Sequence, residues 1–406
     1  MEKYQGGPLF EGVTMFKIQT LNKISAQGLA QLPLDDYETA SEILNPDAIL
    51  LRSADMHSME VPESVKAIAR AGAGTNNIPI PAMTERGIVV FNTPGANANA
   101  VRELVLLALL MASRPVIKAA DWVQGLAGKG SEIPDLAEKG KSQFVGPEIR
   151  GKTLGVIGLG AIGAMVANSA SDLGMNVIGY DPFISVDAAW SLSRAVHKAE
   201  TLDTILTKAD YISIHVPQTA ETKGLINADR IKAMKKGVRL INLARGGLIV
   251  NADVLEGINS GKIACLVTDF ADEELLGNDK IICLPHLGAS TPEAEENCAM
   301  MAVKQLRDFL ETGAIVNSVN FPKCKMDQAI PAGGTRLCIS HKNIPNMVGQ
   351  ITTALAESSL NISTMTSQSR GDLAYTVIDV DTAADGASMY KLGAIKGLIA
   401  VRTIAG

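Results

Sequence analysis

Short apolar runs alternate with helix-like stretches from Phe16 to Thr93, which is the pattern of an α/β domain with a parallel sheet. Three of these runs have the length and side chains of buried parallel strands: Ala48–Leu51, Ala67–Ala69 and Ile88–Phe91. The segments that follow them are Arg52-Ser53, Gly72-Ala73-Gly74 and Asn92-Thr93-Pro94. Ligands of open α/β sheets bind beyond the carboxyl ends of the strands, so these segments are predicted to line a ligand site.

A second alternating block begins after residue 150. Its expected strands have the same short, apolar character: Thr153–Ile157, Asn176–Tyr180, Tyr211–His215, Arg239–Leu243, Ala264–Thr268 and Ile281–Leu284. Before this block, Val101–Trp122 predicts a long, mostly apolar helix that is interrupted near Pro115, and Gln124–Ser142 predicts a surface excursion. After it, Glu293–Thr312 predicts a helix that leaves the block.

The last 70 or so residues have a pattern of their own. A linker with Pro322, Pro331 and the pair Gly333-Gly334 precedes them, and the paired glycines predict a hinge. The expected strands are Leu337–Ser340, Asn361–Thr366, Ala374–Val380 and Ile399–Ile404, and the expected helices are Met347–Glu357 and Ala387–Ile395. This β-α-β-β-α-β order predicts a small ferredoxin-like domain.

Composition limits the class of protein. A chain of 406 residues is long enough for two to three domains, and 47% hydrophobic with 20% charged residues is ordinary for a soluble globular protein. The net charge of −6 provides no basic field, which argues against nucleic acid as a partner. The longest apolar run, Leu104–Ala112, is far shorter than the roughly 20 residues that span a bilayer, so no membrane association is expected.

The cysteines and the N-terminus indicate a cytoplasmic protein. The five cysteines have wide, irregular spacings without a C-x-x-C pair, which argues against a metal site or a disulfide framework and fits a reducing compartment. The first ten residues lack the basic and apolar regions of a signal peptide.

A glycine loop follows the first strand of the second block and opens an Ala-rich helix. Its residues are Gly158, Gly160, Ala161, Ile162 and Gly163. Glycines in this G-x-G-x-x-G spacing let the turn close and the backbone approach a pyrophosphate at the helix N-terminus. Asp181 ends the next strand, where a carboxylate accepts hydrogen bonds from a ribose and disfavours a 2′-phosphate. The loop therefore predicts a dinucleotide site that prefers NAD.

Arg245 and His286 each follow an expected strand and are candidates for catalysis. A guanidinium offers a planar fork for a carboxylate, and an imidazole suits removal of a hydroxyl proton during hydride loss. The alternatives are a structural ion pair for Arg245 and a structural role for His286. Of the other histidines, His57 and His197 are expected on the surface, and His215 is expected to line the cofactor cleft.

Residues 48–320 resemble the D-isomer-specific 2-hydroxyacid dehydrogenases of the formate/glycerate dehydrogenase superfamily. The matching segments are Ala71-Gly72-Ala73-Gly74-Thr75-Asn76-Asn77, Phe91-Asn92-Thr93-Pro94, the glycine loop, His215-Val216-Pro217 and the segments around Arg245 and His286. The resemblance implies a Rossmann-type NAD domain, residues 99–290, inserted in a flavodoxin-like substrate domain, residues 1–98 and 291–325. Residues 335–406 resemble an ACT domain, which is ferredoxin-like and α+β.

The resemblance also implies roles for single residues. Arg245 becomes the substrate clamp and His286 the acid/base. The implied substrate contacts are Arg52, Ser53, Arg70, Ala73, Gly74 and Asn97. Further implied cofactor contacts are Val216, Pro217, Thr222, Ala244 and Asp269, the last of these to the nicotinamide carboxamide. No metal is implied.

The family's catalytic glutamate has two candidates here. Its usual pattern places an Asp two residues before an aromatic residue and the Glu three residues after it, whereas Asp269 directly precedes Phe270. Counting from Phe270 gives Glu273, and counting from Asp269 gives Glu274. Glu273 is preferred because a one-residue deletion before the aromatic residue is the simpler change.

The tail resembles the serine-sensing ACT domains. Their His-x-Asn turn matches His341 and Asn343, and the Asn at the start of their second strand matches Asn361, which implies that L-serine binds. Asn346 stands where a glycine is common. A domain kept only for oligomerisation is the alternative, and the resemblance implies a homo-oligomer, a dimer or a tetramer.

The resemblance implies NAD-dependent oxidation of D-3-phosphoglycerate to 3-phosphohydroxypyruvate, the first step of serine synthesis, with feedback inhibition by L-serine. A hydroxypyruvate or glyoxylate reductase, or another D-2-hydroxyacid dehydrogenase, is the alternative within the family. A non-catalytic regulator that binds NAD and an amino acid is the alternative outside it. The phosphate of the first substrate needs cations, so Arg52 and Arg70 discriminate between the first two.

Overall fold

A computed structural model describes residues 15–406, so the first ten residues, in which no signal peptide is expected, lie outside the described residues. The chain forms two compact units, and each is described by itself. One contains the chain up to Ala96 together with Glu295–Gly406, and the other contains Asn97–Ala294. The division into three domains stays a prediction. Within residues 15–406, no helix is both long and apolar enough to cross a membrane.

The first unit contains a parallel sheet of five strands in the order β2-β1-β3-β4-β5, which is the flavodoxin-like order. The strands are β1 Phe16–Leu21, β2 Tyr37–Ala40, β3 Ala48–Leu51, β4 Ala67–Arg70 and β5 Val89–Phe91. The helices α1 Ala26–Leu29, α2 Ile80–Glu85 and α11 Pro292–Thr312 accompany it. Apolar residues of α11, among them Ala302, Val303 and Leu306, share a core with strand residues. The three predicted strands are confirmed; β1 and β2 carry mixed polar side chains and were not predicted.

The second unit contains a parallel sheet of seven strands in the order β12-β11-β10-β9-β6-β7-β8, a Rossmann order extended by one strand. The strands are β6 Thr153–Ile157, β7 Asn176–Tyr180, β8 Val196–Lys198, β9 Tyr211–Ile214, β10 Val238–Asn242, β11 Ile263–Thr268 and β12 Ile281–Cys283. The helices are α3 Ala98–Ser113, α6 Ala161–Asp172, α7 Val186–Ser191, α8 Leu202–Lys208, α9 Ala228–Ala233 and α10 Asn251–Asn259. All six predicted strands are confirmed, and the short edge strand β8 was missed.

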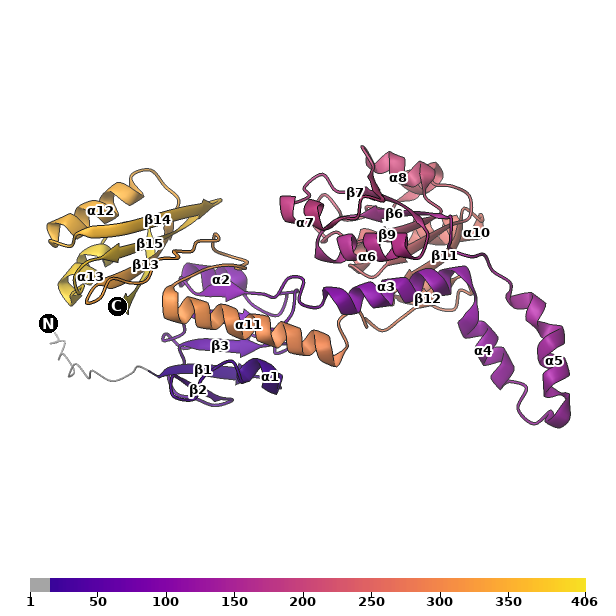
Figure 1. Ribbon diagram of the computed structural model, residues 1–406, viewed down its shortest axis with the longest axis horizontal. Helices are drawn as coiled ribbons and strands as arrows, with labels where there is room; N and C mark the ends of the chain where they lie inside the picture. Colours follow the sequence, from indigo (N-terminus) through magenta and orange to yellow (C-terminus); the bar gives the residue numbers. More distant parts are fainter. Residues whose placement is uncertain (1–14) are drawn as a thin grey trace. The chain divides into compact units, whose positions relative to one another are not determined.

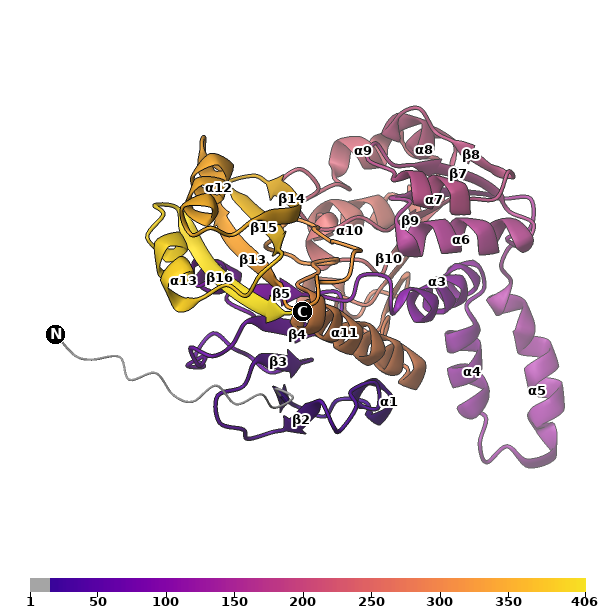
Figure 2. The same ribbon diagram turned by 60° about the vertical axis from the view of Figure 1, so that its left-hand side comes forward.

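A helical arm projects from the second unit beyond α3. As predicted, the long apolar helix is interrupted at Pro115: α3 ends at Ser113, and α4 Val116–Gln124 continues in a new direction (Figure 1). The predicted surface excursion is helical, with α5 Ile133–Gly140 between the short turns η1 Gly130–Glu132 and η2 Lys141–Phe144. Figure 2 shows α4 and α5 running side by side, and neither helix has a buried residue.

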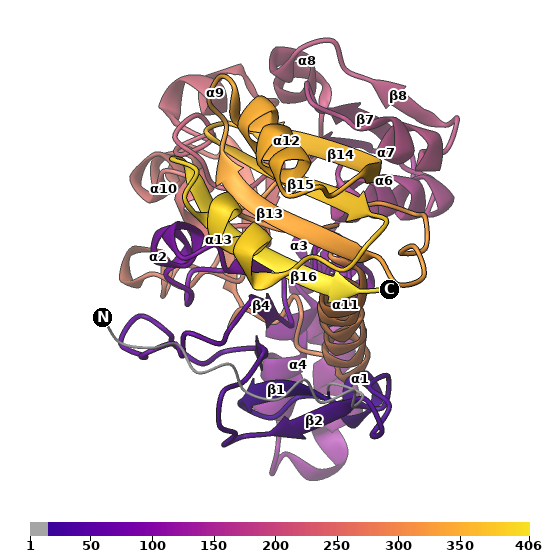
Figure 3. The same ribbon diagram turned by 90° about the vertical axis from the view of Figure 1, so that its left-hand side faces the viewer.

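The tail forms an antiparallel sheet in the order β14-β15-β13-β16. Its elements are β13 Thr335–Lys342, α12 Met347–Glu357, β14 Ile362–Arg370, β15 Leu373–Val380, α13 Gly386–Gly393 and β16 Leu398–Ala405. Both helices lie on one face of this sheet (Figure 3), where Ile351, Leu355 and Leu392 pack on strand residues such as Leu337 and Ile378. The predicted ferredoxin-like order is confirmed.

Within the first unit, side chains of the tail sheet donate hydrogen bonds to the carbonyls at the C-terminal end of α11. The last carbonyls of a helix have no intrahelical donor, and here side chains of the tail supply donors. Arg402 donates from Nη1 to Leu310 O at 3.0 Å, and Tyr375 donates from its hydroxyl to Gly313 O at 3.0 Å. A Cβ on Gly334 would lie 2.3 Å from Val380 O, so this glycine is closely packed. The predicted hinge stays a prediction, and motion there would have to break these contacts.

Candidate active site

The glycine loop has the geometry of a phosphate cradle. Gly158 has φ +91°, and a Cβ on it would lie 2.7 Å from His215 O, so only glycine fits the turn. A Cβ on Gly163 would lie 1.9 Å from Gly158 O, so the helix can pack this closely on the loop only because Gly163 has no side chain. No atom lies within 4 Å of the Cβ position on Gly160, which begins α6 as its N-cap. The loop therefore leaves open space at a helix N-terminus, as a pyrophosphate requires.

Asp181 is tied to the glycine loop. Its Oδ2 accepts a hydrogen bond from the Leu159 amide at 2.8 Å, and its Oδ1 accepts one from the Phe183 amide at 2.8 Å. The carboxylate is half-buried at the end of β7, where each oxygen retains capacity for another donor. This placement fits a ribose next to the cradle.

The loop after β9 contains the predicted residues Val216, Pro217 and Thr222. The Thr222 hydroxyl donates to Pro217 O at 2.6 Å and accepts from the Thr219 amide at 2.7 Å, which closes this loop. His215 precedes it, with Nε2 2.8 Å from Ser213 Oγ. Burial lowers the pKa of His215 to about 4, so it is neutral near pH 7, and this favours a lining role over proton transfer.

Arg245 follows β10 and is exposed. Its carbonyl accepts from Asn242 Nδ2 at 2.8 Å, and its Nη1 donates to Ala244 O at 2.7 Å. Because the Asn242 side chain is fully buried, it fixes the backbone at this strand end. Most of the guanidinium fork is left to meet a substrate carboxylate.

His286 follows β12 and is also exposed. Its amide donates to Asp269 O at 3.0 Å, and its φ is +21°, an unusual value for a residue other than glycine. The imidazole packs against Phe270 with ring centroids 4.9 Å apart. The loops after β11 and β12 are therefore joined at this point.

Asp269 is the buried carboxylate of the site, with 2% of its surface exposed. Burial raises the pKa of its carboxyl, and the charges of His286 and Arg245 and the nearby Gly288 amide act in the opposite direction. Neither carboxylate oxygen has a well-formed hydrogen bond among the described residues. A buried acceptor without a donor is costly, so this carboxylate fits the predicted role of receiving the carboxamide of a bound nicotinamide.

The glutamates do not meet the imidazole in this structure. Glu273 and Glu274 lie in the short turn η4 Glu273–Leu275, which Asp272 caps by accepting from the Glu274 amide at 3.2 Å. Both are exposed, and among residues 15–406 no hydrogen bond or ion pair joins either of them to His286. The catalytic glutamate that the resemblance implies is therefore not bonded to the imidazole in this structure, and the choice between Glu273 and Glu274 stays a prediction.

The predicted substrate loops lie in the first unit. Arg52 forms an ion pair with Glu295 at 2.6 Å, a partner that no sequence pattern indicated. The Arg70 guanidinium lies directly over Gly72, where a Cβ would be 2.2 Å from its Nη1. Asn92 donates from Nδ2 to Ala73 O at 2.7 Å and so fixes the loop that contains Ala73 and Gly74.

The two remaining residues predicted to contact the substrate, Ser53 and Asn97, lie in different units. The Ser53 amide donates to Asn22 Oδ1 at 3.1 Å, which holds the segment after β3 in the first unit. Asn97 is half-buried as the N-cap of α3 and belongs to the second unit.

The predicted regulatory residues divide between two places. His341 and Asn343 line a cavity of about 230 Å³ next to α12 and the end of β14. Both imidazole nitrogens of His341 are engaged, Nδ1 at 2.9 Å from Lys342 O and Nε2 at 2.8 Å from Thr376 Oγ1. Asn361 is not among the lining residues and donates to Asp381 Oδ2 at 2.9 Å.

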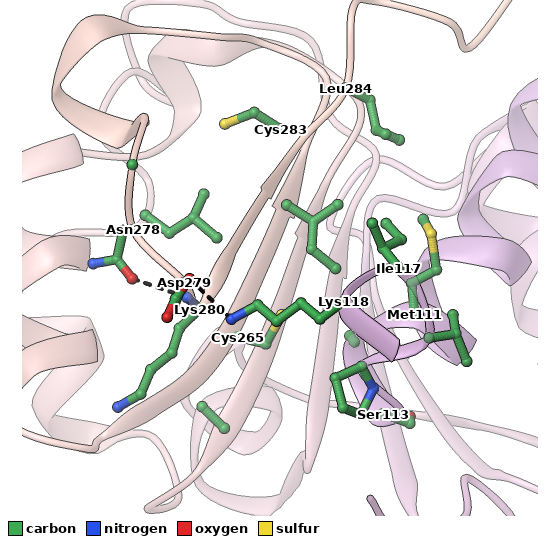
Figure 4. Close-up of a pocket in the computed structure, with 17 residues that line it drawn as sticks. Met111, Ser113, Ile117, Lys118, Cys265, Asn278, Asp279, Lys280, Cys283 and Leu284 are labelled. Carbon is green, nitrogen blue, oxygen red and sulfur yellow. Dashed lines mark hydrogen bonds and ion pairs between the residues drawn. The ribbon is translucent and has the colours of Figure 1, made fainter. Parts of the chain in front are cut away.

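A cavity of about 520 Å³ in the second unit contains none of the predicted site residues. It lies between α4 and strand β12, and two of its lining residues, Lys118 and Asp279, form an ion pair at 3.1 Å (Figure 4). The two histidines expected on the surface, His57 and His197, are exposed.

All five cysteines are free, and the described residues contain no group of three or more side chains suited to hold a metal.

The chain is similar to known proteins along most of its length. Residues 106–289 match the family model described as D-isomer specific 2-hydroxyacid dehydrogenase, NAD binding domain. The chain is 32% identical over 414 residues to the D-3-phosphoglycerate dehydrogenase of Haemophilus influenzae, covering 98% of this chain and 96% of that protein. It is 32% identical over 385 residues to that of Methanocaldococcus jannaschii, covering 92% of this chain and 67% of that protein. The chain spans only 53%, 61% and 58% of three other relatives with the same name.

Solved structures of this fold cover three quarters of the chain. One is a 3-phosphoglycerate dehydrogenase of Entamoeba histolytica with NAD⁺ bound, with 25% identity and a TM-score of 0.58, covering 76% of this chain and 99% of that one. Another is a glyoxylate reductase from Paecilomyes thermophila, with 26% identity and a TM-score of 0.60, covering 75% and 98%.

Proposed function

Because the chain belongs to the D-isomer specific 2-hydroxyacid dehydrogenase family, we propose that it oxidises D-3-phosphoglycerate to 3-phosphohydroxypyruvate with NAD. The observation that supports this substrate best is the similarity to a D-3-phosphoglycerate dehydrogenase along 96% of that protein's length. The open glycine cradle, Asp181 and the unsatisfied carboxylate of Asp269 fit NAD, which when bound accepts the hydride.

The residues of the second unit supply the rest of the chemistry. His286 takes the hydroxyl proton of the substrate, for which its exposed imidazole at the end of β12 is accessible. Arg245 holds the carboxylate and stabilises the oxygen that becomes a carbonyl, since most of its guanidinium donors are uncommitted. Glu273, with Glu274 as the alternative, would have to move to reach the imidazole and orient it.

The residues of the first unit would recognise the anionic ends of the substrate. The Ala73 and Gly74 amides are proposed to hold the carboxylate, and Arg52 and Arg70 to meet carboxylate or phosphate, with Ser53 as a further contact from this unit and Asn97 as one from the second unit. In this structure Arg52 is paired with Glu295, both about half exposed, and an exposed pair of this kind is worth little. A phosphate can therefore displace Glu295 at small cost.

A substrate panel tests the proposal. Purified protein with NAD should form NADH from D-3-phosphoglycerate, and Arg52→Ala should raise the KM for this substrate about tenfold or more while leaving that for unphosphorylated D-glycerate unchanged. Arg150→Ala, which removes an exposed arginine of the other unit, is the matched control. Absence of turnover with D-3-phosphoglycerate, together with rapid reduction of glyoxylate or hydroxypyruvate, would instead establish the reductase.

Feedback by L-serine is the second part of the proposal. His341 and Asn343 border one cavity, whereas Asn361 lies at the other end of β14, about 20 Å along the strand from Ser367. A ligand that contacts all three predicted residues thus requires two tails, which supports a homo-oligomer, a dimer or a tetramer. Calorimetry should detect L-serine binding that Asn343→Ala and Asn361→Ala both weaken; no binding, or no effect of either variant on inhibition, contradicts the proposal.

A cytoplasmic location belongs to the same proposal. The five free cysteines, three of them fully enclosed in the core of the first unit, fit a reducing compartment. Fractionation of cells that produce the tagged protein would test this, and recovery in a membrane or secreted fraction would contradict it.

A further inference from the structure

Among residues 15–406, no hydrogen bond joins the His286 imidazole to a carboxylate, although the charge of Asp269 acts on it, and the imidazole packs against the ring of Phe270. We propose that Phe270 is a positioning residue, whose ring holds the His286 imidazole in place and ties it to the loop that contains Arg245. This inference rests on the proposed function, in which His286 moves the proton. Three sets of contacts support it, and all of them lie in the second unit.

The backbone places the two rings together. The Phe270 amide donates to Thr268 Oγ1 at 3.2 Å, and the Thr268 side chain is fully buried at the end of β11. The Leu284 amide donates to Thr268 O at 2.8 Å, and the His286 amide donates to Asp269 O at 3.0 Å. These bonds join the ends of β11 and β12, so the separation of the two side chains is set by the sheet and not by a flexible loop.

The ring geometry is that of a packed aromatic pair. The centroids of Phe270 and His286 are 4.9 Å apart and the planes meet at 55°, within the range in which such pairs attract beyond the effect of area burial. The electron-rich face of a phenyl ring also suits a neighbour that gains positive charge when it takes a proton. His286 itself has φ +21°, a costly conformation that persists only when the surroundings enforce it.

Phe270 also touches the loop of the substrate clamp. A Cβ on Gly246 would lie 3.2 Å from Phe270 Cβ and 3.5 Å from its Cγ, so the backbone after Arg245 lies close to this side chain. One side chain therefore contacts both the loop that follows β10 and the imidazole that follows β12. Removing the ring removes its packing against the imidazole and opens space beside Gly246.

The test separates positioning from general stability. Phe270→Leu keeps an apolar side chain but removes the ring, whereas Phe270→Tyr retains an aromatic ring. Phe144→Leu is the matched control, because Phe144 forms a comparable tilted pair with Trp122 at 5.5 Å on the helical arm of the same unit. With histidine labelled by carbon-13, five Hε1–Cε1 ring signals are expected, and His286→Gln assigns the relevant one.

We expect Phe270→Leu to remove the ring-current shift of the His286 signal and to lower kcat about tenfold, because misplaced catalytic groups cost rate and not binding. KM for the substrate and Kd for NAD should stay within about twofold, Phe270→Tyr should restore kcat, and Phe144→Leu should resemble the wild type. If Phe270→Leu does not fold by circular dichroism, Phe270→Met replaces it.

The outcomes distinguish the two proposals. An unchanged histidine signal, or a kcat within twofold of the wild type in the ring-less variant, would overturn the positioning role. A wild-type protein without any NAD-linked turnover of 2-hydroxy acids would overturn the proposed function, while the histidine signal would still decide whether Phe270 holds the imidazole.

Discussion

Arg336 and Asp379 form a bidentate ion pair in the tail, with Nε–Oδ1 at 2.7 Å and Nη2–Oδ2 at 2.8 Å. The two side chains are 2% and 1% exposed. The same guanidinium donates from Nη1 to Thr312 O at 3.2 Å, at the last residue of α11. This buried pair thus connects strands β13 and β15 to the C-terminal end of α11, whose apolar residues share a core with the five-stranded sheet.

Removal of one partner of this pair should be strongly destabilising. Asp379→Ala leaves the Arg336 charge buried without its counter-ion, so we expect the free energy of unfolding to fall by about 3–5 kcal/mol. Glu200→Ala breaks the exposed pair with Lys198 and should cost less than about 1 kcal/mol. Urea unfolding of the two variants gives the comparison, and equal losses would show that the buried pair contributes no more than a surface pair.

Two glycines of the nucleotide loop should respond differently to alanine. Gly163→Ala places a Cβ 1.9 Å from a backbone oxygen and should lower the melting temperature as well as NAD binding. Gly160→Ala meets no atom within 4 Å, so the protein should fold normally and lose NAD affinity because the methyl group occupies space that the pyrophosphate needs. Gly393→Ala in α13, which also meets no atom, is the control, and NAD titration by fluorescence is the measurement. Wild-type affinity in Gly160→Ala would place the pyrophosphate elsewhere.

His286→Ala should abolish most of the activity without affecting stability. Loss of a general acid/base lowers kcat by about 10²–10⁴-fold. The side chain is exposed, so its removal should leave the melting temperature nearly unchanged. His197→Ala, an exposed histidine of strand β8, should retain full activity. A His286→Ala enzyme with more than a tenth of the wild-type kcat would contradict the assignment.

His215 should make stability depend on pH in the acid range. Burial lowers its folded-state pKa from 6.5 to about 4, so between these values the unfolded chain binds a proton that the folded protein does not. Its contribution to stability is therefore complete above pH 6.5 and is lost as the pH falls toward 4. His215→Asn cannot titrate and should lose less stability, on the order of 2 kcal/mol, between pH 7 and pH 4.5.

Urea unfolding of both proteins at the two pH values provides the measurement for His215. Other groups titrate in the same range, so the relevant quantity is the difference between wild type and variant. Parallel losses in the two proteins would mean that the imidazole is charged in the folded state.

Most strands of the two parallel sheets could be predicted because they are buried on both faces and so appear as uninterrupted apolar runs. Ala48–Leu51 and Tyr211–Ile214 are examples, and every residue in both is buried. Strands β1, β2 and β8 escaped prediction because their side chains are partly exposed and include polar ones. Pro115 correctly marked the break between α3 and α4, because proline lacks the amide that a helix interior needs.

The sequence by itself determined the order of the chemical groups, since a glycine spacing, an acid at a strand end, an arginine and a histidine are local features. What only the tertiary structure decided is which groups meet. It put Phe270, and neither Glu273 nor Glu274, against His286, and it paired Arg52 with Glu295, 243 positions away in the numbering of the chain. The physical reason is that side chains from different strand ends meet through sheet register and helix packing, which depend on contacts between residues distant in sequence.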